Sequence, residues 1–199
     1  MNRSPKRILV VSIIVVLSII LGIVADLIWD SIDKKIHPND HLEYVRLYAY
    51  EYNIPESIIF AVIKVESDFD PDAESSAGAR GLMQMLPSTF EWLTGEEHLN
   101  ENLPKSKLFT PEVSIKYGTY YLNYLYHKFD CNWNTALAAY NGGEGNVAKW
   151  LQDPEYSDGN GNLIEIPFKE TKNYVEKVNK ERDTYKKLYY NDQKEVIEP

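Results

Sequence analysis

The chain has 199 residues, of which 44% are apolar and 26% charged, and its formal net charge at pH 7 is −9. This length suffices for a membrane segment plus one globular domain with its own core, and it leaves little room for a second full-sized domain. The excess of acidic residues argues against nucleic acid, or any anionic polymer, as a ligand held by charge.

The first predicted element is a helix that crosses a membrane. Basic residues at positions 3, 6 and 7 precede residues 8–25, which carry no charge, and residues 27–29 are apolar again after Asp26. At about 1.5 Å per residue, roughly 20 such residues cross a bilayer core. A cleaved signal peptide is the competing interpretation, because residues 23–25 weakly resemble a processing site. The length of the run and the bulky Ile23 favour an uncleaved anchor.

The charges that flank this span predict its orientation. Positive charge before the span and acid after it place the N-terminus in the cytoplasm and residues 30–199 on the extracytoplasmic side of a single-pass protein. Removing the first three basic residues from the total of 21 leaves 18 against 30 acidic ones, so the chain from Asp26 onward carries about −12. Its ligand is therefore expected to be near neutral where it is bound. The expected parts are a cytoplasmic tail, an anchor, a stalk, one domain and a C-terminal tail, at residues 1–7, 8–29, 30–40, 41–190 and 191–199.

Beyond the stalk the sequence has the periodicity of helices. Helices are predicted at residues 42–49, directly after Pro55, at 115–129, at 133–140 and from Thr171 to Val178. We expect Pro55 in a first turn, Gly142-Gly143 at the end of the fourth helix and Thr171 as the cap of the last. Residues rich in helix breakers connect these elements, at 75–81, 95–111 and 153–167. Turn-forming residues 157–162 predict a small hairpin in the last connection. The expected fold class is mainly α, with loops that converge on a cleft.

Glu66 is the most informative residue of the predicted domain. Ile63, Val62 and Ile59 precede it by three, four and seven positions, so the carboxyl group continues an apolar helical stripe. Burial raises the pKa of a carboxyl group, and an acid that keeps its proton near neutral pH can protonate a leaving group. The simpler alternative is a partly exposed acid at the end of a helix.

Three polar clusters follow Glu66 in the sequence. Residues 75–85 combine small residues, which let the backbone approach a ligand, with the amide of Gln84. Tyr140 and Asn141 lie at the predicted end of a helix, and residues 170–175 place an acid and a tyrosine at the start of another. Amide groups can pair with the hydroxyl and acetamido groups of sugars. Each cluster alone is a weak signal.

Together and in this order, the segments resemble the Slt-type lytic transglycosylases, relatives of goose-type lysozyme that cleave the glycan strand of peptidoglycan. The resemblance extends from about residue 42 to 180 and is carried by Ile54-Pro55, Val65-Glu66-Ser67, Phe69-Asp70-Pro71, Ser75, residues 78–84, Thr110-Pro111, Gly118, Tyr121-Leu122, residues 138–141, Pro167-Phe168, Glu170-Thr171 and Tyr174-Val175. It implies a lysozyme-like α-helical domain of the α+β superfamily with a substrate cleft.

The resemblance also implies the roles of individual residues. Glu66 matches the catalytic acid and base of the family. Ser75 matches a loop serine that hydrogen-bonds near the reacting sugar, and Gln84 and Tyr140 match residues that line the sugar subsites beside the scissile bond. Glu170 matches an acid near the site, for which a binding role is expected.

Other residues in these motifs have two interpretations. Met83 is a candidate for substrate contact, but packing in the core is the simpler expectation. Asn141 is a second candidate, with the alternative that its side chain fixes the Gly142-Gly143 turn. Ser67 is expected to bond locally to the backbone. Gly142 departs from the family pattern, in which alanine is usual.

The implied reaction uses one carboxyl group, because no second carboxylate is evident for the usual pair of a glycosidase. Glu66 would protonate the glycosidic oxygen of the MurNAc-β-1,4-GlcNAc bond and then deprotonate the C6 hydroxyl of the same MurNAc, which closes a 1,6-anhydro ring. The alternatives are a muramidase that hydrolyses the same bond, a glycan-binding module and a subunit of a cell-envelope complex. No cofactor or metal is expected, because the four histidines lack the spacing of metal ligands, and the lone Cys131 has no partner for an internal disulfide.

Overall fold

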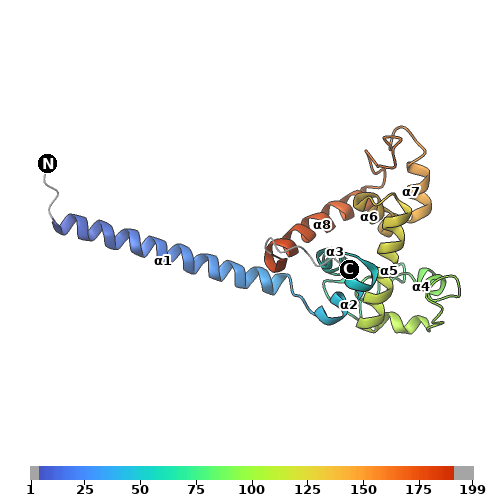
Figure 1. Ribbon diagram of the computed structural model, residues 1–199, viewed down its shortest axis with the longest axis horizontal. Helices are drawn as coiled ribbons and strands as arrows, with labels where there is room; N and C mark the ends of the chain where they lie inside the picture. Colours follow the sequence, from blue (N-terminus) through green and yellow to red (C-terminus); the bar gives the residue numbers. More distant parts are fainter. Residues whose placement is uncertain (1–4, 191–199) are drawn as a thin grey trace. The chain divides into compact units, whose positions relative to one another are not determined.

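The computed structural model describes residues 5–190, so residues 1–4 of the predicted cytoplasmic tail (1–7) and the whole predicted C-terminal tail (191–199) lie outside the described residues. It divides between Pro38 and Asn39 into two compact units. The first unit contains helix α1 (Pro5–Ile36) (Figure 1). Residues Leu9–Ile36 of this helix are long and apolar enough to cross a membrane, with a hydropathy of 2.9 in the most apolar window. The helix also continues through most of the predicted stalk, because no breaker precedes Pro38.

The second unit is built from helices. They are α2 (Leu42–Tyr52), α3 (Glu56–Ser67), α4 (Pro87–Leu93), α5 (Pro111–Lys128), α6 (Trp133–Gly142), α7 (Glu144–Trp150) and α8 (Lys169–Tyr185), with a 3₁₀ turn η1 (Lys105–Phe109) and a π-helical turn η2 (Lys186–Tyr190). Between residues 5 and 190 there is no strand, only isolated bridges. The mainly α prediction is therefore confirmed. The predicted hairpin is reduced to a single bridge between Ser157 and Leu163.

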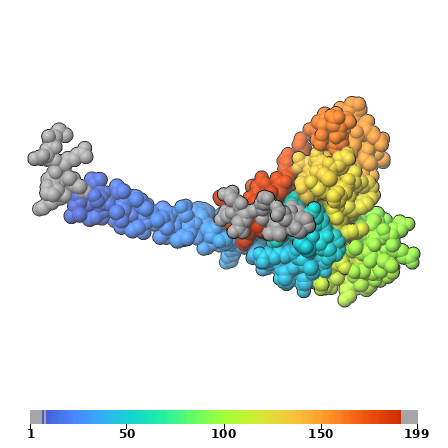
Figure 2. Space-filling view, in the orientation of Figure 1, coloured from blue at the N-terminus to red at the C-terminus, as the bar shows by residue number. Residues whose placement is uncertain are grey.

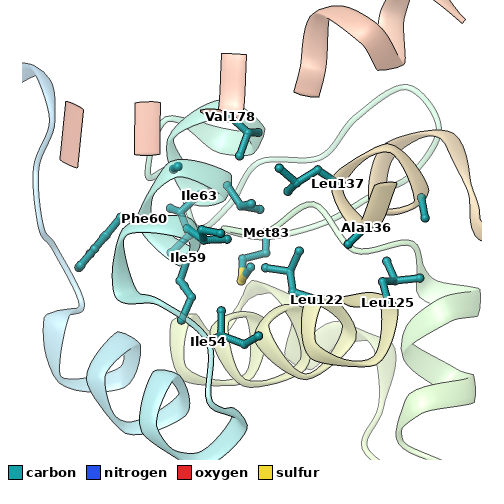
Figure 3. Close-up of a cluster of buried hydrophobic side chains, with 14 of the residues drawn as sticks. Ile54, Ile59, Phe60, Ile63, Met83, Leu122, Leu125, Ala136, Leu137 and Val178 are labelled. Carbon is teal, nitrogen blue, oxygen red and sulfur yellow. The ribbon is translucent and has the colours of Figure 1, made fainter. Parts of the chain in front are cut away.

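Helix α3 lies at the centre of this unit. Seven consecutive residues, from Ser57 to Ile63, are buried, because α2 and α8 both pack against the helix. Figure 3 shows Met83 between Ile59 of α3 and Leu122 of α5. Each fully buried aliphatic side chain of this kind contributes about 1.5–3 kcal/mol relative to exposure. The last residues of α3 are thereby held on a rigid core.

Glycine allows two helices to approach their neighbours closely. A Cβ at Gly118 of α5 would lie 2.3 Å from Met83 Sδ, so a larger residue would displace the Met83 side chain. A Cβ at Gly142 of α6 would lie 3.0 Å from Thr171 Oγ1 of α8. Gly142, which differs from the usual alanine, therefore fits the tight contact between α6 and α8.

Several helix ends differ from the sequence expectation. Helix α8 begins at Lys169 with Phe168 as its N-cap, whereas Thr171, the expected cap, is buried inside the first turn. Packing against Gly142 takes precedence over capping for this side chain. Pro55 is the N-cap of α3 and does not lie in its first turn. The short helices α4 and α7 were not predicted, although Pro87 at the start of α4 is a known signal.

Candidate active site

Glu66 is the penultimate residue of α3, where the buried face of the helix reaches the surface. Ile59, Val62 and Ile63 are fully buried, as the apolar stripe predicted, and the Glu66 side chain is partly buried. Removal from water raises the pKa of the Glu66 carboxyl from 4.5 to about 7, and the Tyr174 hydroxyl acts in the opposite direction. The protonated form of the group is therefore present at neutral pH.

Two tyrosine side chains surround this carboxyl group. Burial, followed by the nearby Glu66 charge, raises the pKa values of both Tyr140 and Tyr174 well above 10, so both hydroxyls keep their protons. The Tyr140 hydroxyl donates to the carbonyl oxygen of Met83 at 2.8 Å. The Tyr174 hydroxyl is buried and makes no well-formed hydrogen bond to a described residue. It is the hydroxyl available to Glu66 or to a ligand.

Ser67 ties the end of α3 to the loop that carries Gln84. Its Oγ donates to the carbonyl oxygen of Leu82 at 2.8 Å, and that of Ile63 lies at 3.3 Å. Ser67 was expected to act only locally, but its shorter bond is made across the fold. This contact fixes the loop beside Glu66.

Glycine and Gln84 close the same loop. The φ angle of Gly81 is +74°, and a Cβ there would lie 1.9 Å from the Leu108 carbonyl oxygen, so only glycine fits. Gln84 has a φ of +44°, and its Nε2 donates to the carbonyl oxygens of Ala73 at 2.9 Å and Gly81 at 3.0 Å. The amide nitrogen thus donates both of its hydrogen bonds within the loop, and the amide oxygen is the part of Gln84 that can accept a hydrogen bond from a ligand.

Ser75 forms a tight turn of its own. Its Oγ accepts from the Ala79 N–H at 3.1 Å, and its backbone N–H donates to the Ala79 carbonyl oxygen at 2.9 Å. The side chain is exposed. A ligand at this position would meet a hydroxyl whose direction the turn has already set.

The remaining predicted residues differ in exposure. Met83 is fully buried, which matches the expectation of core packing, and it contributes to the site by the carbonyl oxygen that holds Tyr140. Asn141 is exposed, and the turn after α6 is held instead by Asn146, whose Nδ2 donates to the Gly142 carbonyl oxygen at 2.8 Å. Glu170 is exposed one helical turn before Tyr174 on α8.

Two tyrosines beside the site were not singled out from the sequence. Tyr174 lies in a quoted motif, and its position one turn after Glu170 was the signal that could have assigned it. Tyr121 of α5 has its ring centroid 5.5 Å from that of Tyr140. Burial and the Glu144 charge raise the pKa of Tyr121.

Other features of the described part do not coincide with Glu66. A hollow of about 480 Å³ is lined by Cys131, Asn132, Trp133, Asn134, Asn179 and Arg182, none of which is a candidate site residue. Among residues 5–190, no three or more His, Cys, Asp or Glu side chains gather as metal ligands would. The arrangement at Glu66 offers proton transfer by one carboxyl group, with tyrosine hydroxyls and an amide oxygen to orient a polar ligand.

The helical fold, with one acid of raised pKa beside such groups, is typical of the lysozyme-like class of domains. Comparison with protein families gives the particular assignment: residues 43–161, more than half of the chain, match the transglycosylase SLT domain. The chain therefore belongs to this family. The resemblance found in the sequence motifs is confirmed.

Individual relatives agree with this assignment. A putative soluble lytic murein transglycosylase of Haemophilus influenzae is 40% identical over 159 residues, which are 75% of this chain and 25% of the relative. The membrane-bound lytic murein transglycosylase C of Edwardsiella ictaluri is 28% identical over 200 residues, with coverage of 86% and 53%. The solved 70 kDa soluble lytic transglycosylase of Escherichia coli superposes with a TM-score of 0.72 at 30% identity, over 84% of this chain and 27% of that one. The chain thus spans about a quarter of the soluble relatives and half of the membrane-bound one.

Proposed function

We propose that this protein is a peptidoglycan lytic transglycosylase that cleaves the MurNAc-β-1,4-GlcNAc bond and leaves a 1,6-anhydro-MurNAc end. The observation that carries the proposal is Glu66, a carboxyl group with a pKa of about 7 at the end of a buried helix. Relatives named lytic murein transglycosylases support it. A solved Pseudomonas aeruginosa relative is described as an inactive mutant in which one glutamate is replaced by glutamine.

The first step uses Glu66 as an acid. Its proton passes to the glycosidic oxygen, the bond from that oxygen to C1 of MurNAc breaks, and the GlcNAc side leaves as an alcohol. The carbonyl oxygen of the MurNAc N-acetyl group bonds to C1 in its place, so no protein carboxylate is required as nucleophile. Because the Glu66 pKa is near 7, the protonated form is available at neutral pH.

The second step uses the same group as a base. The Glu66 carboxylate takes the proton of the C6 hydroxyl, O6 bonds to C1, and the N-acetyl oxygen departs. Glu66 ends the cycle protonated, and no water is consumed. A pKa near the operating pH suits a group that must first give and then take a proton.

Neighbouring residues bind and orient the sugars in this scheme. The Tyr174 hydroxyl donates to the Glu66 carboxylate when the proton has left, and Tyr140 presents its ring at the site with its hydroxyl fixed on Met83. The amide oxygen of Gln84 and the hydroxyl of Ser75 accept or donate to sugar hydroxyl and acetamido groups. Asn141 and Glu170, both exposed, contact more distant parts of the ligand.

The proposal includes a location for the reaction. Helix α1 serves as a single-pass anchor, with the domain on the extracytoplasmic side, where peptidoglycan lies. Relatives described as membrane-bound support anchoring. Participation in a cell-envelope complex stays a prediction from the sequence.

Analysis of the products tests the proposal. The full-length protein in detergent micelles is incubated with purified sacculi, and the released muropeptides are resolved by mass spectrometry. We expect anhydro products that are lighter by one water than lysozyme products. Products with reducing ends alone would instead establish the muramidase alternative.

A pair of variants tests the role of Glu66 in the same assay. Glu66→Gln is expected to lower the rate by about 10²–10⁴-fold, because acid–base catalysis contributes that much. Glu155→Gln is the matched control, since Glu155 is an exposed carboxylate outside the site. Equal rates for the Glu66→Gln and wild-type proteins would show that Glu66 is not the acid.

A further inference from the structure

A row of aromatic rings leads away from Tyr140 across three helices. The ring centroids of Tyr140 and Tyr121 are 5.5 Å apart, those of Tyr121 and Tyr124 are 6.2 Å apart, and those of Tyr124 and Trp92 are 5.2 Å apart. Trp92 comes from α4, Tyr121 and Tyr124 from α5, and Tyr140 from α6. In Figure 2 the green surface of the α4 region adjoins the yellow surface of the α5 and α6 region. The row is thus continuous with the candidate site.

The three rings pack against one another in two orientations. Tyr121 and Tyr124 are three residues apart on α5, so they share one side of the helix, and their planes differ by only 12°. The Trp92 ring stands at 87° to Tyr121 and at 78° to Tyr124. Trp92 thus packs edge-to-face against the near-parallel rings of Tyr121 and Tyr124, and the three side chains form one apolar cluster.

Packing between helices does not fully bury the Trp92 side chain. It is 37% exposed, more than either of the other tryptophans of the second unit, Trp133 and Trp150. His98 supports it at a centroid distance of 4.1 Å, and the His98 Nδ1 pairs with the Tyr120 hydroxyl at 3.1 Å. Trp92 is therefore held in place while part of its ring faces solvent, which is a common property of binding aromatics.

Polar groups border this aromatic cluster as well. The Lys128 Nζ lies 5.2 Å from the centroid of the Tyr124 ring and donates to the Tyr124 hydroxyl at 3.0 Å. Lys128 also pairs with Glu144 at 2.9 Å, so the charges at this border balance. A neutral ligand with an apolar face and hydroxyl groups at its rim matches such a surface.

We propose that Trp92, Tyr121 and Tyr124 form an additional subsite, which binds sugar units of the same glycan strand beyond the unit at Tyr140. The proposal rests on the function proposed above for the choice of ligand. A sugar ring lies with its C–H face against the solvent-facing part of Trp92, which Tyr121 and Tyr124 hold in place. The subsite contributes to the binding of long strands and takes no part in proton transfer.

Binding to strands of different length tests this subsite without requiring turnover. Dye-labelled glycan strands, freed of peptide, are titrated with the full-length Glu66→Gln protein in detergent micelles, and dissociation constants are read from fluorescence anisotropy. Addition of Trp92→Ala is expected to weaken the binding of long strands about tenfold, a typical loss for truncating an aromatic anchor. Binding of the shortest strands that the protein retains should stay within about twofold, because they do not reach Trp92.

Two further variants complete the test. Trp133→Ala is the matched control, because Trp133 of α6 stacks on Tyr126 of α5 at a centroid distance of 4.2 Å and lines the separate hollow. It should leave both constants unchanged, and Trp92→Phe should restore most of the affinity for long strands. Unchanged binding of long strands by Trp92→Ala, equal losses for long and short strands, or no binding of any strand would overturn the subsite. A protein that binds strands in this pattern but does not cleave them would contradict only the proposed function.

Discussion

Two glutamates of this domain lie beside tyrosine hydroxyls in surroundings of opposite character. Glu101 pairs with Lys116 and accepts a hydrogen bond from the Tyr117 hydroxyl at 2.9 Å. The same hydroxyl lies 3.0 Å from the Thr94 Oγ1, which also accepts from the Leu103 N–H. The Lys116 side chain is the main cause that lowers the Glu101 pKa. This carboxylate stays charged and holds residues 94–103 in place.

Glu66 also has a tyrosine neighbour, but no salt bridge between described residues includes it. Burial therefore determines its protonation, and its pKa rises to about 7 where that of Glu101 falls. The nearby cation, and not the tyrosine, therefore separates a structural carboxylate from one that can exchange protons near neutral pH.

The largest expected effect on stability comes from Glu66, whose contribution to the free energy of unfolding changes with pH in the opposite direction to that of Glu101. A raised native pKa means that native Glu66 binds its proton more tightly than the unfolded chain, so stability falls as pH rises from about 4.5 to about 7. Glu66→Gln removes this loss and should stabilise the protein by up to about 3 kcal/mol above pH 7, with little effect below pH 4.5. Chemical denaturation at several pH values measures this difference.

Glu101→Gln provides the contrast in the same experiment. The Glu101 pKa is lowered in the folded protein, so the carboxylate stabilises the fold at pH values above the pKa of the unfolded chain. This stability is lost as pH falls. Glu101→Gln should therefore destabilise the protein at pH 8 and do so less at low pH. If both variants shift stability in the same direction at pH 8, the contrast between the two sites is wrong.

A smaller effect is expected for Ser67, which positions Glu66 through the backbone of the loop. Ser67→Ala removes the bond to the Leu82 carbonyl oxygen and should lower stability by about 1 kcal/mol. Thr184→Ala is a suitable control, because its hydroxyl bonds to the Lys180 carbonyl oxygen on an exposed turn of α8. Thermal unfolding should separate the two variants, and equal midpoints would show that the contact to Leu82 contributes nothing.

Local periodicity predicted the helical fold and the place of Glu66 at the end of an apolar stripe, because residues three, four and seven apart share one face of a helix. The ordered motifs also indicated Gln84 and Tyr140 as site residues. These patterns could not predict contacts between segments that are distant in the sequence. The bond from Ser67 to Leu82 and the fit of Thr171 against Gly142 depend on how α3, α6 and α8 pack. For the same reason, the neighbour of Glu66 on α8, Tyr174, was quoted in a motif without a role.

The smallest effect is expected for removal of the Tyr174 hydroxyl. If its hydroxyl lowers the Glu66 pKa, Tyr174→Phe should raise that pKa, so the loss of activity at high pH should move to higher pH. The shift should not exceed about one pH unit, since one hydrogen bond contributes about 0.5–1.5 kcal/mol and one unit corresponds to about 1.36 kcal/mol. The pH profile of sacculus digestion measures it. An unchanged profile would mean that burial alone sets the Glu66 pKa, and that Tyr174, unlike Tyr117, makes no effective hydrogen bond to its glutamate.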